Sequence, residues 1–167
     1  MPTGPAARLG DPVTHPLPPV LTGGPGSPNV LIGMQPAWRG LPAAAVAGLQ
    51  SAKATADKVI QVAEIAALAA AFTPAGPAAY AAEQTAKAVT LLSMSSAITA
   101  AAAGGSDIHQ CATPSPVPPH GPGVVIDGSA TVLINNMPAC RMGDTLLEAI
   151  GPPNKIAMGA PTVIIGG

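Results

Sequence analysis

The sequence predicts a mainly β fold: three pseudo-threefold repeats of short strands form a tapered body, and an alanine-rich helical hairpin interrupts the second repeat. The main observation is a motif that occurs three times in the 167 residues. Each copy opens on a Pro-Ala-x-Arg sequence and closes on a glycine and an apolar run; the openings are PAARLGD (5–11), PAWR (36–39) and PACRMGD (138–144), and the closings are GSPNVLIG (26–33), GSATVLIN (128–135) and GAPTVIIG (159–166). Repeats of one small unit usually bury their apolar faces against one another, so three units predict one compact body.

The composition excludes several classes of function. Only 9% of the residues are charged and the net charge is −1, which argues against a nucleic-acid surface. Trp38, Phe72 and Tyr80 are the only aromatic residues, so stacking platforms for bases or sugars are not expected. Glycine and proline number 19 and 21 and separate runs of β-branched residues, a pattern typical of tight turns between short strands.

The N-terminus and the cysteines indicate where the chain is made. No basic segment followed by an apolar core is present at the N-terminus, so no secretory signal peptide is expected and synthesis is expected in the cytoplasm. Cys111 and Cys140 do not make a disulfide framework, and metal binding is the first expectation for one of them. Cys140 corresponds to Ala7 of the first unit and is expected to be a small buried residue.

Charged residues recur at fixed places in the three units. The three arginines of the chain and three aspartates occupy equivalent positions: Arg8, Arg39 and Arg141, and Asp11, Asp107 and Asp144. Asp107 rejoins the second unit after the insert. Such residues can pair with each other or hold the amides of a turn. We expect them to be structural groups at the corners of a small β fold rather than catalytic groups.

The repeats can bring every histidine of the chain to one point. His109 and Cys111 are two residues apart just after the insert, and His120 follows a proline-rich loop. His15 and Cys111 each lie four residues after the aspartate of their units, and Glu148 holds this position in the third unit. Three imidazoles and one thiolate form a tetrahedral set that suits zinc. Four protein ligands leave no open position for water, which indicates one structural ion and leaves Glu148 as a spare carboxylate; the alternative is that the histidines are scattered over loops.

These motifs resemble the PAAR-repeat proteins, which are named for a Pro-Ala-Ala-Arg motif. The resemblance lies in PAARLGDPVTH, HQC, PPHGPG, GSATVLINNMPACRMGD and GPPNKIAMGAPTVIIGG, and it covers residues 4–40 and 106–167. It implies a small conical body that caps the central spike of a contractile injection machine. Type VI secretion systems and related phage-tail-like particles are such machines.

The resemblance also implies a ligand set and a partner. A zinc ion holds the tip of these cones, and its ligands map by position onto His15, His109, Cys111 and His120. The broad base sits on a trimeric β-helical spike of the VgrG type. A monomer with three quasi-equivalent edges can face three identical chains, so one copy per trimer is expected.

The insert at residues 41–105 departs from the repeats, so the cone comprises residues 1–40 and 106–167. Polar residues recur at helical spacing in its first half, the sequence TPAGP at 73–77 breaks the pattern, and a second helical segment ends at two glycines. These features predict an alanine-rich helical hairpin. We expect it to make only its own helix–helix contacts and the cone to fold without it.

A membrane segment is the alternative interpretation of the insert. A membrane span needs about 20 strongly apolar residues, and the uncharged stretches here contain Pro-Gly-Pro or are diluted by serine and threonine. A soluble hairpin is therefore favoured, with membrane contact only during injection. The hairpin remains a candidate docking site for an effector toxin or a chaperone.

Three classes of function follow from these observations. A structural spike tip is the leading one, and a carrier whose insert binds a toxin, a chaperone or a membrane is the second. The third, a zinc hydrolase, is disfavoured because the metal would use all three histidines, which leaves no Ser-His-Asp set. No glycine-rich phosphate loop followed by a helix is visible either. The chain is therefore expected not to be an enzyme and to have no catalytic residues.

Overall fold

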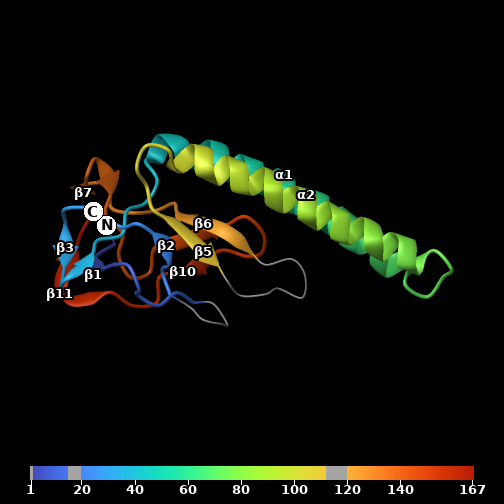
Figure 1. The fold of residues 1–167 in the computed structure, drawn as a ribbon, viewed down its shortest axis with the longest axis horizontal. Helices are drawn as coiled ribbons and strands as arrows, with labels where there is room; N and C mark the ends of the chain where they lie inside the picture. Colours follow the sequence, from blue (N-terminus) through green and yellow to red (C-terminus); the bar gives the residue numbers. More distant parts are fainter. Residues whose placement is uncertain (1, 15–19, 112–119) are drawn as a thin grey trace.

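The computed structural model describes residues 2–14, 20–111 and 120–167, which form a body of short strands and a long helical hairpin (Figure 1). In chain order the elements are β1 (Gly4–Ala6), β2 (Gly23–Gly24), β3 (Leu31–Ile32), β4 (Gln35–Pro36), α1 (Ala43–Ala70), α2 (Gly76–Ala102), β5 (Ile108–Cys111), β6 (Gly121–Val125), β7 (Leu133–Ile134), β8 (Met137–Pro138), β9 (Thr145–Glu148), β10 (Asn154–Lys155) and β11 (Ala160–Ile165). The helices contain 28 and 27 residues, and the longest strand described contains 6. The expected mainly β class is therefore too narrow: the molecule is mixed α and β, with strands in the body and helices in the insert.

Three two-stranded antiparallel ribbons give the body its pseudo-threefold symmetry. Two are hairpins, β3–β4 and β7–β8, and the third pairs β11 with β1, so the two ends of the chain lie side by side (Figure 1). Three equivalent bridges join the ribbons into a ring: Ala6 with Arg141, Arg8 with Ala37, and Arg39 with Ala139. The repeats of the sequence therefore correspond to repeats of the structure.

The recurring arginines and aspartates pair as expected. Their side chains meet at 2.7 Å in the first unit, 2.8 Å in the second and 3.0 Å in the third. In each unit the aspartate also accepts a hydrogen bond from the backbone N–H of the arginine, at 2.7, 2.8 and 2.9 Å. Arg39 and Asp107 make this contact across the whole insert, so the insert interrupts the second unit without displacing its corner.

The core of the body repeats the same symmetry. Small and apolar residues at equivalent places in the three units are fully buried; they are Ala6, Ala37 and Ala139, then Ala7, Trp38 and Cys140, then Leu21, Val125 and Ile156. Cys140 is buried, as expected for a small core residue, and its counterpart in the second unit is the large Trp38. One bulky side chain therefore fills the axis where its two counterparts are small.

A five-stranded antiparallel sheet forms the other part of the body, in the order β10-β9-β6-β5-β2. In Figure 1 the strands β5, β6 and β10 lie on the side away from β1, β3 and β11. His109 of β5 and Glu148 of β9 are both in register with Gly123 of the strand between them. Residues in register across neighbouring strands share a face, so this row sets the positions of the candidate site.

The insert is the hairpin that the sequence predicts. Alanine is the strongest helix former, and Pro77 lies in the first turn of α2, where its missing N–H costs nothing. Lys87 pairs with Glu83 at 2.6 Å, as the spacing predicts, and with Glu64 of α1 at 2.8 Å. Within the described residues, neither helix is long and apolar enough to cross a membrane.

The expectation that the hairpin makes only helix–helix contacts is wrong. Leu49 of α1 and Met94 and Ile98 of α2 share one buried cluster with Val124 of β6 and Leu147 of β9. The reason lies in the strands, because β6 and β9 are apolar on both faces. Val125 and Leu146 point into the body, and their neighbours point outward beneath the helices. The half of the hairpin near the body is thus part of a common core.

Candidate metal centre

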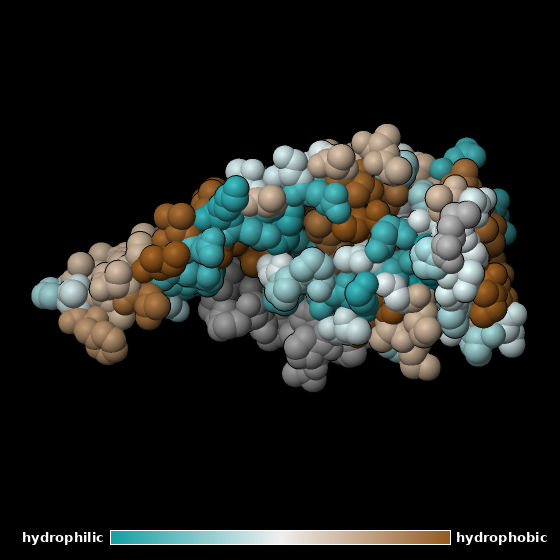
Figure 2. All heavy atoms as spheres, turned by 180° about the vertical axis from the view of Figure 1, so that it is seen from behind, coloured by the Kyte–Doolittle hydropathy of each residue, from teal (hydrophilic) through white to brown (hydrophobic). Residues whose placement is uncertain are grey.

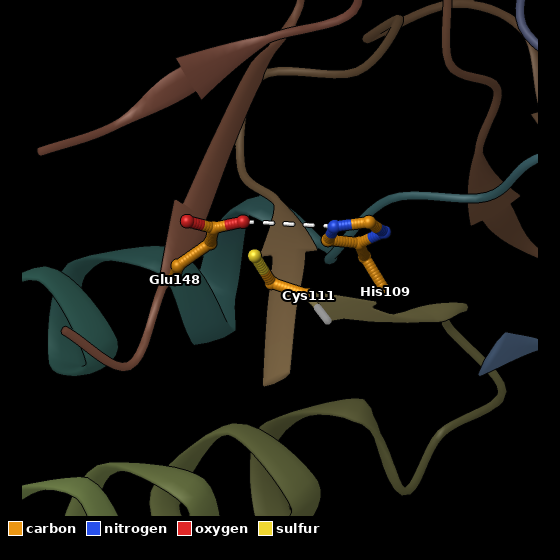
Figure 3. Close-up of side chains that lie close together, drawn as sticks. All are labelled: His109, Cys111 and Glu148. Atoms are coloured by element: carbon orange, nitrogen blue, oxygen red, sulfur yellow. Dashed lines mark ion pairs between the residues drawn. The ribbon is translucent and has the colours of Figure 1, made fainter. Parts of the chain in front are cut away.

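The arrangement of strands β5, β6 and β9 in the sheet brings three potential ligands together. His109 and Cys111 are two residues apart on β5, so their side chains lie on the same face, and Glu148 lies on that face of β9 (Figure 3). Gly123 lies on β6, the strand between β5 and β9, and has no side chain to fill the space between His109 and Glu148. A Cβ at this position would lie 2.9 Å from Cγ of Glu148. The glycine therefore lets the carboxylate reach toward the imidazole and the thiol.

The donor atoms of the three residues are close enough to share an ion. One imidazole nitrogen, the Cys111 Sγ and a carboxylate oxygen all lie within 4.8 Å of one another. His109 Nε2 is 3.6 Å from Glu148 Oε1, and the backbone N of Thr22 lies 3.4 Å from Nδ1 on the other side of the ring. His109 and Glu148 are 2% and 0% exposed. Two members of the group are thus buried, and Cys111 is partly exposed.

The chemistry of this set fits zinc. Imidazole, thiolate and carboxylate are all common zinc ligands. A buried carboxylate beside a cysteine is costly unless a positive charge balances it, and a divalent cation would balance a thiolate and a carboxylate together. His109, Cys111 and Glu148 are the residues that could hold such an ion. A metal held there would link β5 to β9 across β6.

His120 adjoins this group through Glu148. Its Nδ1 lies 2.9 Å from Glu148 Oε2, and Nδ2 of Asn154 donates to the same oxygen at 2.9 Å. The other side of the ring packs on Gly151, where an added Cβ would lie 3.1 Å from Nε2. Burial lowers the pKa of His120 below its usual value, and the nearby ammonium of Lys53 lowers this pKa further. A neutral imidazole is therefore favoured at this position.

The structure brings together part of the ligand set inferred from the sequence. His109 and Cys111 lie together with Glu148, and His120 borders this group of three without belonging to it. His15 lies outside the described residues. Glu148 takes the place beside His109 and Cys111, although the sequence analysis treated it as a spare carboxylate. Its position four residues after the aspartate of its unit, the same as that of Cys111, was the signal for this role.

The comparison with protein families finds a match in the C-terminal part of the chain. Residues 115–167 match the family described as the PAAR motif. This part of the chain carries a PAAR motif. The match begins in the second unit and includes the whole third unit, and the ring of ribbons adds the first unit to it. Neither a curated protein nor a solved structure matches the chain. The match to the PAAR motif supports a role at the spike tip of contractile injection systems in general.

Proposed function

We propose that this PAAR protein is the structural tip that caps a trimeric VgrG-type spike, with one copy per trimer. The observation that carries the proposal is a set of three apolar side chains on the three ribbons. Leu31, Leu133 and Ile164 occupy equivalent places and are 62%, 56% and 61% exposed. Each precedes a buried isoleucine of its ribbon. Exposed apolar residues that repeat with the symmetry of the fold favour a threefold partner.

The edges of the ribbons support the same partner. A two-stranded ribbon presents unpaired backbone groups along its edges, which soluble proteins normally cover or blunt. A trimeric spike that meets the three ribbons would cover these edges and the three apolar side chains together. In Figure 2 apolar surface is visible at the end of the body that lies opposite the free end of the hairpin.

Substitution of the three ribbon residues tests this proposal. Changing Leu31, Leu133 and Ile164 to aspartate should abolish binding to the cognate spike protein, because each change puts a carboxylate into an apolar contact. All three side chains are more than half exposed, so the fold should be retained, which circular dichroism checks. Undiminished co-purification of the triple variant with the spike would refute the proposed base.

A matched control uses exposed apolar residues elsewhere in the chain. Val62, Ile65 and Leu68 of α1 are 68%, 60% and 75% exposed. Their replacement by aspartate should leave spike binding unchanged. Loss of binding in both triple variants would mean that the assay reports general exposure to solvent or aggregation rather than the ribbons.

We also propose that the tip holds one structural zinc ion and carries out no reaction. The ligands proposed are His109 and Cys111, with the remaining positions taken from Glu148, His120 and His15. Zinc would hold the loops and strands of the narrow end together without chemistry of its own. The protein would be made in the cytoplasm, load onto the spike there and leave the cell with it.

A carrier role is the second candidate, and the surface of the hairpin favours it. Apolar side chains along the hairpin are exposed: Val59, Val62, Ile65, Leu68, Phe72, Tyr80, Val89 and Leu92. Figure 2 shows this apolar surface along the hairpin. Such a surface suits an effector, a chaperone or a membrane met during injection. Co-expression with proteins encoded beside it, in wild type and in the hairpin triple variant, tests this role.

A further inference from the structure

Lys53 is a buried cation that joins the hairpin to the body near the candidate metal centre. It lies on α1 and is 5% exposed. Its Nζ donates to the backbone oxygen of Gly151 at 3.0 Å and pairs with Asp57 one turn further along the helix. Burying an ammonium group is costly unless specific partners receive it, so the contact with Gly151 is a defined tie rather than a passing surface contact.

Gly151 connects this tie to His120. The residue has a φ of +88°, in the left-handed region that favours glycine, and a Cβ there would lie 3.1 Å from Cε1 and Nε2 of His120. The preceding residue, Ile150, donates its backbone N–H to the carbonyl of His120 at 3.1 Å. The loop that Lys53 holds is thus the surface against which the His120 ring packs.

His120 in turn holds one oxygen of Glu148. Its Nδ1 and Nδ2 of Asn154 both lie 2.9 Å from Oε2. The other oxygen, Oε1, faces Nε2 of His109 at 3.6 Å, on the side of Cys111 (Figure 3). The two oxygens therefore have separate surroundings, one inside the candidate centre and one in the contacts that orient the carboxylate.

A cavity lies next to the contact between Lys53 and Gly151. It has a volume of about 300 Å³ and is lined by Ile60 and Lys87 of the helices and by His120 and Gly151 of the body. At this level the hairpin is therefore not packed closely against the body. The Lys53 contact lies at the border between the common core and this cavity.

We propose that Lys53 is a positioning residue for the metal centre and that the helical insert thereby supports the metal at the tip. Lys53 fixes the Gly151 loop, the loop fixes His120, and His120 with Asn154 orients the carboxylate of Glu148 toward the ion. This inference rests on the proposed zinc site. Groups that orient metal ligands commonly change metal affinity by about 10- to 100-fold when they are removed.

The test compares zinc affinity in three variants of the full chain by competition with a chromophoric chelator. Lys53→Met should lower zinc affinity about tenfold and shift the absorption bands of the cobalt-substituted protein, with helix content unchanged. Lys53→Arg, which keeps the charge and a donor, should restore much of the loss. Lys58→Met removes an exposed lysine of the same helix and should have no effect.

A second variant keeps the test decisive if Lys53→Met does not fold. Gly151→Ala should weaken zinc binding in the same way, because the new methyl group would push against His120. The double variant should lose little more than either single one, since both changes act on the same contact. Wild-type affinity and an unchanged cobalt spectrum in Lys53→Met or Gly151→Ala would overturn the inference. A wild-type protein without zinc would overturn the zinc proposal as well.

Discussion

The pairing of Arg39 with Asp107 joins the two parts of the second unit that the insert separates. Asp107 is 0% exposed and accepts hydrogen bonds from both the backbone N–H and the guanidinium of Arg39. These residues are separated by the entire insert. The equivalent arginine of the first unit, Arg8, has a side chain that is 22% exposed. The Arg8–Asp11 pair is therefore more exposed to solvent than the Arg39–Asp107 pair.

The first prediction uses this difference. Arg39→Ala should lower the free energy of unfolding by about 3–5 kcal/mol, because it leaves a buried carboxylate without its counter-charge. Arg8→Ala should cost clearly less, since water can reach Asp11 once the side chain is gone. Urea denaturation of the two variants measures the difference. Equal losses of unfolding free energy would mean that burial does not determine how much these arginine–aspartate pairs stabilise the fold.

The second prediction concerns the pH dependence of stability. Burial raises the pKa of Asp144 to about 6, although the contacts with Arg141 lower this pKa. The folded protein then binds the proton of Asp144 more tightly than the unfolded chain does, whose pKa is near the ordinary 3.8. The contribution of this group to stability is therefore largest below pH 4 and declines as the pH rises through 6.

Comparison with Asp144→Asn isolates this effect. The stability advantage of the wild type over the variant should shrink between about pH 4 and pH 7. Urea denaturation across this range measures it, and metal loss at low pH affects both proteins. An advantage that grows with pH would contradict a raised pKa for Asp144.

Sequence reasoning reached the arginine and aspartate pairs because they recur in register, but it assigned Glu148 only by position. The alignment of the repeats gives Glu148 the same position as Cys111. The carboxylate was not included in the expected ligand set because histidine and cysteine were preferred as zinc ligands. The absence of a side chain at Gly123, which lets Glu148 approach, depends on the pairing of β5, β6 and β9. The order of these strands in the sheet cannot be inferred from the sequence repeats.

At the scale of elements, the limits of the hairpin were predictable and its docking was not. Pro74, Gly76 and Pro77 mark the turn, and Gly104 and Gly105 mark the end. The packing of the helices on the body depends on Val124 and Leu147, which the sequence shows only as members of continuous apolar runs. Such runs predict strands covered on both sides without saying what covers them.

The third prediction concerns removal of the hairpin. Deleting residues 41–105 and joining Gly40 to Ser106 should still give a folded ring of ribbons, since the bridges between the units lie outside the insert. The variant should be less stable by about 3–6 kcal/mol, the value of burying two side chains the size of Val124 and Leu147. It should also bind zinc more weakly, because Lys53 is absent.

Urea denaturation and metal analysis of the deletion variant measure both effects. Replacing Val124 and Leu147 by threonine in the same variant should improve its solubility, because these side chains become exposed. An unfolded deletion variant that the threonine changes do not rescue would show that the helices are needed to form the body.

The whole molecule has two ends with different surroundings. The ribbon strands β1, β3 and β11 lie at one end, and the strand β5 that carries His109 and Cys111 lies further along (Figure 1). The turn of the hairpin projects furthest in that direction (Figure 1). If the ribbons sit on the spike, the hairpin points away from it, toward the target. The deletion variant should therefore still bind the spike, even though it is less stable.

A monomer with three quasi-equivalent ribbons is expected to match one trimer of the spike protein. The direct measurement is the mass of the complex reconstituted with the cognate spike protein, by native mass spectrometry or light scattering. The proposal predicts one copy of this chain per spike trimer, and the complex should be lost when Leu31, Leu133 and Ile164 are changed to aspartate. Three copies per trimer, or no complex with the cognate spike, would contradict it.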